Sequence, residues 1–165
     1  MKKIKLFTDS SVNPQKKIGF GAFLKISDES FSFEELKKTI KIKRFEDTSS
    51  TKLELQTLLW ALDEIAVIDE NTQIEVYTDC QNILSLQNRR EKFEINDYKT
   101  STKKTINNHE LYKLFFEKID KFNIDFIKVK GHKKNSLKNE IDKIFNLVDK
   151  ASRNALRESS LTNFI

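Results

Sequence analysis

Four acidic residues occupy positions from which their carboxylates can meet around a divalent cation. Asp9 and Asp79 each follow a β-rich segment, while Glu54 and Asp149 interrupt the apolar series of two amphipathic segments. Residues just past the carboxyl ends of neighbouring parallel strands face a shared crevice, so we expect Asp9 and Asp79 to lie close together. Converging carboxylates repel one another unless a cation lies between them. The four acids, each on a different element, could therefore converge on a metal ion.

Each acid also has an ordinary structural interpretation. An Asp after a strand commonly forms a turn or caps a helix, and Asp79 could cap a helix beginning at residue 80. Glu54 could complement a helix dipole at the surface, and Asp149 could be a solvated helix position. The metal interpretation thus depends on the elements that carry these residues.

Alternating, β-rich segments predict five strands, at residues 3–8, 18–27, 39–45, 73–78 and 124–129. Apolar residues at helical spacing predict four helices, at residues 53–66, 80–87, 110–122 and 139–157. Ser49, Ser50 or Thr51 can cap the first of these helices.

The connecting segments give weaker signals. Residues 13–17 predict a turn, residues 28–38 a strand extension with a short insertion, and residues 89–108 are polar, basic and aperiodic. Three antiparallel strands followed by βαβ units predict an α/β fold. We therefore expect one mixed five-stranded sheet, three strands antiparallel and then two parallel, flanked by helices.

Composition restricts the class of protein. The 165 residues include 38% hydrophobic residues and 13 Phe, enough for a buried core, and no linker-like stretch divides them. A single domain over residues 1–165 is therefore expected. The chain lacks a long apolar run and a signal-peptide pattern, and it has one Cys, which together predict a cytoplasmic protein without disulfides or membrane contact. The net charge of +5 is a weak indication of a polyanionic partner.

Five short motifs, taken in order, resemble those of the ribonuclease H family. They lie at residues 8–11 (TDSS), 50–55 (STKLEL), 77–81 (YTDCQ), 129–132 (VKGH) and 148–153 (VDKASR). The resemblance extends over nearly the whole chain, and each motif falls on the type of element that the family has there. It implies the ribonuclease H-like fold.

The resemblance also implies a metal-binding set. Asp9, Glu54, Asp79 and Asp149 match the family's metal-binding acids. His132 matches a loop histidine proposed to assist product release or proton transfer in the catalytic cycle.

Other positions match the family's substrate contacts. Asn13 matches a position near the RNA strand, and Gln81 matches a residue that contacts the substrate backbone. Ser50 and Thr51 replace an Asn pair and can still exchange hydrogen bonds with ribose or base edges, although with shorter reach.

This chain departs from the family pattern at several points. Ser10 replaces the usual Gly after the first acid, which restricts the backbone, and Cys80 replaces the usual Ser after the third. The fourth acid has two candidates. Asp142 has the more usual spacing from His132, whereas Asp149 has the better flanking residues; we favour Asp149.

By the same resemblance, the reaction is endonucleolytic hydrolysis of the RNA strand of an RNA–DNA hybrid, leaving 5′-phosphate and 3′-hydroxyl ends. A set of carboxylates without Cys or paired His ligands favours two Mg²⁺ ions, with Mn²⁺ as a substitute, over zinc. Two such ions can activate water and stabilise the leaving oxygen. The 2′-hydroxyl is the group that distinguishes RNA from DNA.

Basic residues supply candidate phosphate contacts. Arg89, Arg90 and Lys99 are predicted to bind substrate, as a basic handle that some family members use to grip the DNA strand. The alternative is a solvated charged loop, since three acids lie among them. Residues 130–138 form a second basic patch around His132.

Two other functions fit the same fold. One is a catalytically silent nucleic-acid-binding module, and the other is a different nuclease or integrase-type enzyme. The retained acids argue against the first, because buried unpaired carboxylates are costly without a metal. No feature indicates a dimer seam, so a monomer is expected.

Overall fold

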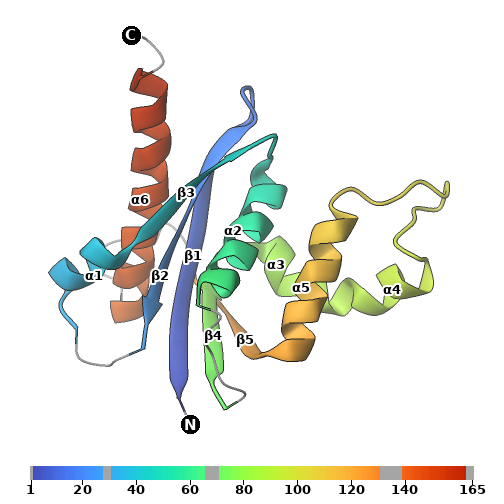
Figure 1. Ribbon diagram of the computed structural model, residues 1–165, viewed down its shortest axis with the longest axis horizontal. Helices are drawn as coiled ribbons and strands as arrows, with labels where there is room; N and C mark the ends of the chain where they lie inside the picture. Colours follow the sequence, from blue (N-terminus) through green and yellow to red (C-terminus); the bar gives the residue numbers. More distant parts are fainter. Residues whose placement is uncertain (1, 28–30, 66–70, 131–138, 163–165) are drawn as a thin grey trace.

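The computed structural model describes residues 2–27, 31–65, 71–130 and 139–162, which contain one five-stranded sheet. The strands are β1 (Lys3–Asn13), β2 (Ile18–Ile26), β3 (Lys41–Glu46), β4 (Gln73–Thr78) and β5 (Asn123–Lys128). They lie in the order β3-β2-β1-β4-β5 (Figure 1). The β3-β2-β1 pairs are antiparallel and the β1-β4-β5 pairs are parallel, which confirms the predicted mixed sheet.

Helices cover both faces of the sheet. Those in the described ranges are α1 (Phe33–Thr39), α2 (Ser50–Glu64), α3 (Gln81–Leu86), α4 (Arg90–Ile95), α5 (His109–Lys121) and α6 (Glu140–Thr162), with a 3-10 turn, η1 (Gln87–Arg89), before α4. α1 and α6 lie on one side of the sheet, and α2 to α5 lie on the other (Figure 1). Over these described ranges, no helix combines the length and apolar character needed to cross a membrane.

Side chains of β1 enter two separate cores. Successive residues of a strand point to opposite faces of the sheet. Leu6 packs in a cluster with Leu55 and Leu58 of α2, whereas Phe7 packs in a second cluster with Val148 of α6. Both Leu6 and Phe7 are completely buried. β1 is therefore fixed between two helical layers. The residues that follow Phe7 in β1 also point alternately toward α2 and toward α6.

Two glycines of β2 allow α2 to lie close to the sheet. A Cβ at Gly19 would lie 2.3 Å from Leu53 Cδ2, and a Cβ at Gly21 would lie 2.1 Å from Thr57 Oγ1. These distances are far inside van der Waals contact, so a larger residue at either position would force the side chains of α2 or the neighbouring backbone to shift. Glu54 lies between these two contact points on α2, and the glycines therefore set how closely it approaches β1.

Two connecting segments differ from their predictions. Part of the segment 28–38, expected to extend a strand, forms α1, because Ser32 Oγ caps it by accepting from Glu35 N at 3.2 Å and Leu36 is buried. Part of the aperiodic segment 89–108 forms α4, which buries Phe93.

The ends of two elements also differ from those predicted from the sequence. Asp9 does not end β1, because β2 continues to pair with β1 as far as Asn13 after β4 has stopped pairing at Phe7. Asp79 does not cap the following helix, since the residue at the cap of α3 is Cys80.

Gly21→Ala should lower the free energy of unfolding by about 1–3 kcal/mol, because its new Cβ overlaps Thr57. Urea denaturation followed by circular dichroism measures the change. Thr57→Ala removes the two nearest of the atoms that this Cβ would meet, so the double variant should lose less than the sum of the two single variants. Strict additivity would show that the contact does not limit the approach of α2.

Candidate active site

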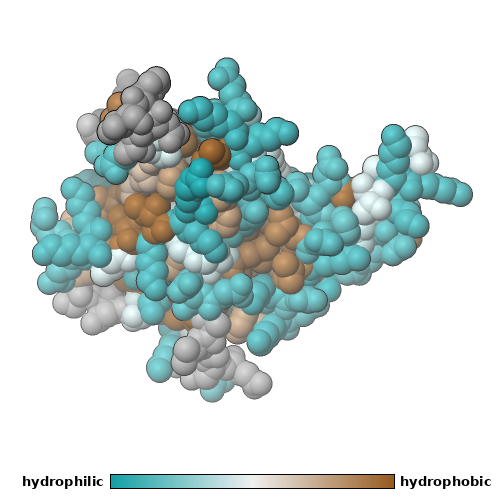
Figure 2. All heavy atoms as spheres, turned by 45° about the horizontal axis from the view of Figure 1, so that its top comes forward, coloured by the Kyte–Doolittle hydropathy of each residue, from teal (hydrophilic) through white to brown (hydrophobic). Residues whose placement is uncertain are grey.

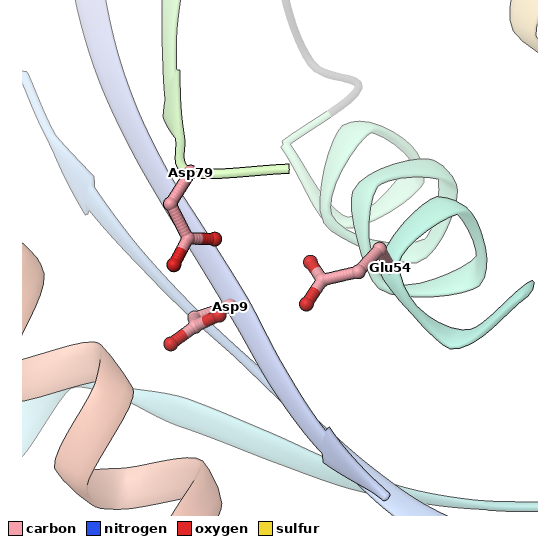
Figure 3. A group of neighbouring side chains, drawn as sticks. All are labelled: Asp9, Glu54 and Asp79. Atoms are coloured by element: carbon pink, nitrogen blue, oxygen red, sulfur yellow. The ribbon is translucent and has the colours of Figure 1, made fainter. Parts of the chain in front are cut away.

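Three carboxylates from different elements point toward one another (Figure 3). Asp9 lies in β1, Glu54 lies in α2, and Asp79 directly follows β4. Each offers one oxygen, and these oxygens lie within 4.8 Å of one another. Asp9 is buried, whereas Asp79 is partly exposed. The group is therefore reachable from solvent on the side of Asp79.

Parallel pairing brings Asp9 and Asp79 together. The register of β1 and β4 ends with Phe7 opposite Tyr77, so each acid lies two residues beyond its paired residue. The rings of Phe7 and Tyr77 stack with centroids 4.6 Å apart. A strand step of two residues returns a side chain to the same face, so Asp9 follows Phe7 toward the α6 side, while Asp79 comes directly after the end of β4.

Glu54 reaches the group from the other helical layer. Ser49 Oγ caps α2 by accepting from Lys52 N at 3.4 Å, which places Glu54 just beyond the first turn. Ser10 Oγ donates to Glu54 Oε1 at 2.7 Å. Glu54 Oε2 is buried and has no hydrogen-bond partner among the described residues. One oxygen of this carboxylate is thus held, and the other lacks a partner.

Asp149 of α6 lies against Asp9. The two side chains are within hydrogen-bonding contact, and the charge of Asp149 also acts on Glu54. Arg153 Nη2 donates to Asp149 Oδ2 at 2.7 Å. The buried Ser152 Oγ donates to the Asp149 carbonyl at 3.0 Å and lies 3.1 Å from Ser11 Oγ of β1. These contacts fix this turn of α6 beside β1.

Asp142, the other candidate for the fourth acid, caps the start of α6. Asn139 Oδ1 accepts from Asp142 N at 2.9 Å, and Asp142 Oδ2 accepts from Asn139 N at 3.2 Å. This reciprocal pair is a capping box at the start of α6. Asp142 is buried there, while Asp149, two turns later, contacts Asp9.

The carboxylates raise one another's proton affinity. Burial, followed by the charges of Glu54 and Asp79, raises the pKa of Asp9 from 3.8 to about 9. Burial raises the pKa of Glu54 from 4.5 to about 7, although the hydrogen bond from Ser10 opposes the rise. Without a cation the group therefore retains protons near neutral pH, and a bound cation would displace them.

The donor set fits a hard divalent cation. Its ligand atoms are carboxylate oxygens, the ligands that Mg²⁺ and Mn²⁺ prefer. The partnerless Glu54 Oε2 is a buried acceptor that such an ion would satisfy. Cys80 lies next to Asp79, but burial raises the pKa of its thiol, which disfavours the thiolate that a soft metal needs.

Of the four polar residues predicted to contact substrate, three border the acids in sequence or space. Ser50 and Thr51 are exposed on the first turn of α2, one turn before Glu54. Gln81 begins α3, two residues after Asp79, and its Oε1 accepts from Lys128 Nζ at 3.2 Å. Asn13 lies at the far end of β1, where its Oδ1 accepts from the backbone N–H groups of the turn at 3.1 and 3.2 Å.

A basic hollow lies beside α4. It has a volume of about 500 Å³, and Arg89, Lys92 and Lys99 are among the residues that line it. Arg89 Nη1 donates to Asn82 Oδ1 at 2.8 Å, and its guanidinium lies over the ring of Phe93, 4.9 Å from the centroid. The segment between α4 and α5 projects from the body of the molecule (Figure 1), with a mostly hydrophilic surface (Figure 2).

Arg90 has other partners. Its guanidinium donates to both carboxylate oxygens of Asp120 at 2.6 and 2.7 Å, and its Nε donates to Glu94 Oε1 at 2.8 Å. The structure therefore separates Arg90 from Arg89 and Lys99 among the predicted basic residues. Sequence reasoning missed Phe93, although its spacing of four from Arg89 is that of neighbours on a helix.

The predicted loop histidine, His132, lies outside the described residues, together with the basic positions 131–138. Lys130, directly before this segment, is exposed. The interpretation of His132 therefore stays a prediction from the sequence.

Known proteins resemble this chain over most of its length. The family model for RNase H matches residues 1–155. The chain belongs to the RNase H family. A ribonuclease H of Clostridium botulinum is 33% identical over 152 residues, which cover 88% of this chain and 95% of the relative. A ribonuclease H of Acetivibrio thermocellus is 30% identical over 148 residues, which cover 87% of this chain and 92% of that relative.

Solved structures of RNase H proteins share the fold. LC9-RNase H1, a type 1 RNase H with the type 2 active-site motif, matches with a TM-score of 0.66 at 15% identity, over 93% of this chain and 73% of the other. The PFV RNase H domain matches with a TM-score of 0.66 at 12% identity, over 93% and 92%. The resemblance seen in the motifs is thus confirmed, and with it the assignment to the ribonuclease H class of enzymes.

The raised proton affinity of the acids predicts a pH-dependent stability for the metal-free protein. The folded state binds more protons than the unfolded chain between the ordinary and raised pKa values of Asp9 and Glu54. Stability is therefore lost as pH rises, and the free energy of unfolding in EDTA should fall by a few kcal/mol between about pH 6 and about pH 9. Urea titrations at several pH values measure this slope.

Asp9→Asn should flatten the slope and raise the stability of the metal-free protein at high pH, because it removes the most strongly shifted group. Asp63→Asn removes an exposed carboxylate of α2 and serves as the control, with the slope of the parent protein. An unchanged slope in Asp9→Asn would contradict the proposed source of the pH dependence.

Proposed function

We propose that this protein is a metal-dependent endonuclease that hydrolyses the RNA strand of RNA–DNA hybrids and leaves 5′-phosphate and 3′-hydroxyl ends. The observation that carries the proposal is the meeting of Asp9, Glu54 and Asp79 within 4.8 Å in a chain of the RNase H family. A silent binding module would gain nothing from three converging carboxylates that raise one another's proton affinity.

In this proposal Asp9, Glu54, Asp79 and Asp149 hold two Mg²⁺ ions, and Mn²⁺ can replace them. The ions supply activation of water and neutralise the charge that develops on the attacking and leaving oxygens. The protein's own part is to position the four acids, which are carried by the sheet, by α2 and by α6. The contact between Asp149 and Asp9 supports Asp149 as the fourth ligand, while the capping role of Asp142 accounts for that acid without a metal.

Polar residues around the acids are proposed to select the substrate. Ser50 and Thr51 expose hydroxyl groups one turn from Glu54, where they can exchange hydrogen bonds with ribose and base edges. Gln81 is exposed beside Asp79 and can contact the backbone. Asn13 lies at the tip of the β1–β2 hairpin and would reach the RNA strand further from the acids. The 2′-hydroxyl is the group that such contacts can read.

The basic hollow is proposed to bind phosphates of the DNA strand. Arg89 and Lys99 line it, and the stack of Arg89 on Phe93 holds the guanidinium in place. Arg90 would support this segment through Asp120 rather than contact phosphate directly. Such contacts are independent of sequence, so affinity should fall with salt. His132 is proposed to assist proton transfer or product release.

Cleavage of a labelled RNA–DNA hybrid tests the function. The protein should cut the RNA strand in Mg²⁺ or Mn²⁺ but not in EDTA, and should leave double-stranded RNA and double-stranded DNA intact. Asp79→Asn should reduce cleavage by at least about 10²-fold, because it removes a metal ligand, while the circular dichroism spectrum persists. Asp125→Asn, on the edge strand β5, is the control with full activity. Absence of hybrid cleavage in either metal would refute the proposal.

A second comparison identifies the fourth acid. Asp149→Asn should lose most hybrid cleavage, whereas Asp142→Asn should keep it and lose about 0.5–2 kcal/mol of stability through a weaker cap. Initial rates and thermal melts of both variants measure the two effects. Full activity in Asp149→Asn with loss in Asp142→Asn would reverse the assignment.

A further inference from the structure

Ser10 lies at a strand position that points it at Glu54. The alternation of β1 sends Phe7 toward α6 and Leu6 toward α2. By the same step of two residues, Ser10 follows Leu6 to the α2 side. Its Oγ donates to Glu54 Oε1 at 2.7 Å, across 44 positions of sequence. The contact therefore joins the central strand to the first turns of α2 at the acidic group.

The two oxygens of Glu54 are in different states. Oε1 receives the Ser10 hydroxyl, and the Ser10 backbone also donates to this carboxylate. Oε2 is buried and partnerless within the described ranges, while the carboxylate as a whole faces Asp9 and Asp79 (Figure 3). A hydrogen bond to an ionised carboxylate is short and strong, so it restricts rotation of the group. Holding Oε1 thereby fixes the direction in which Oε2 points.

We propose that Ser10 is a positioning residue that holds Glu54 Oε1 so that Oε2 is presented to the metal; this rests on the proposed metal-dependent function. Groups that hydrogen-bond a metal ligand from outside orient it, and their loss commonly weakens metal binding by about 10–100-fold. A glycine at this position would have no side chain to make the bond.

The neighbouring contacts strengthen this assignment. Ser10 pairs with Gly21 of β2, and Gly21 lies directly under Thr57 of α2. Thr57 is three residues after Glu54, so both contacts lie on the same side of the helix. The glycine contact sets the distance of α2 from the sheet, and the Ser10 bond sets the direction of the carboxylate at that distance.

The test compares Ser10→Ala, Ser10→Gly and Ser10→Thr. Isothermal titration of each protein with Mg²⁺ and with Mn²⁺ measures the dissociation constant. We expect Ser10→Ala and Ser10→Gly to bind either ion about 10-fold more weakly than the parent protein. Ser10→Thr keeps the hydroxyl and should bind within about twofold of the parent. Ser160→Ala removes a hydroxyl bonded to Leu156 O near the end of α6 and should leave binding unchanged.

A double-variant cycle separates positioning from a purely structural bond. If Ser10 acts through Glu54, then adding Ser10→Ala to Glu54→Gln should weaken Mg²⁺ binding no further. Hybrid cleavage by Ser10→Ala should need about 10-fold more Mg²⁺ for half-maximal rate, with KM for the hybrid unchanged. A structural role alone would lower the melting temperature in EDTA and leave the Mg²⁺ dependence as it was.

The outcomes distinguish the two proposals. If the parent protein binds Mg²⁺ but does not cleave hybrid, the proposed function fails and the titration of the Ser10 variants still decides the positioning role. Equal Mg²⁺ affinity of Ser10→Ala and the parent would overturn the inference, as would additive losses in the cycle with Glu54→Gln.

Discussion

The repulsion among the clustered carboxylates is the constraint on which the rest of the structure depends. Oxygens of Asp9, Glu54 and Asp79 lie within 4.8 Å of one another, and burial together with the neighbouring carboxylates raises the pKa of Asp9 to about 9. Such an arrangement disfavours folding unless the surrounding packing holds it. Leu6 and Phe7, both fully buried, fix the strand just before Asp9 between two helical layers. The cores therefore do more than stabilise the fold, since they keep together charges that would otherwise separate.

Charge is distributed so that this repulsion stays local. The chain has 30 basic and 25 acidic residues, yet Arg89, Lys92 and Lys99 gather at a hollow beside α4 rather than pairing with the clustered acids. A basic residue in contact with Asp9 or Glu54 would compete with a cation for the same oxygens. Arg153 contacts Asp149, whose side chain is one quarter exposed. The net charge of +5 therefore combines a cluster of carboxylates with a separate basic hollow beside α4.

Much of this was predictable from the sequence, and the failures have physical causes. The parallel pairing of β1 and β4 made the meeting of Asp9 and Asp79 predictable, because both follow β-rich segments. The length of β1 was not, since Asp9 to Asn13 pair with β2 beyond the last residue that pairs with β4, and hydrophobic periodicity does not show how far the pairing with β2 extends. The choice between Asp142 and Asp149 stayed open, although Asn139 and Asp142 have capping-box spacing. Ser10 was noticed only as a departure, because a hydrogen bond across 44 positions leaves no local pattern.

The alternation of β1 explains why one strand can serve two helices at once. Asp9 contacts Asp149 of α6, and Ser10, the next residue, contacts Glu54 of α2. A slip of one residue in the pairing of β1 would exchange these faces, burying Phe7 against α2 and turning Asp9 away from Asp149. The stack of Phe7 on Tyr77 and the fit of α2 over Gly21 oppose such a slip from opposite sides of the sheet. Core packing therefore fixes the register of β1, and that register in turn gives each acid its partner.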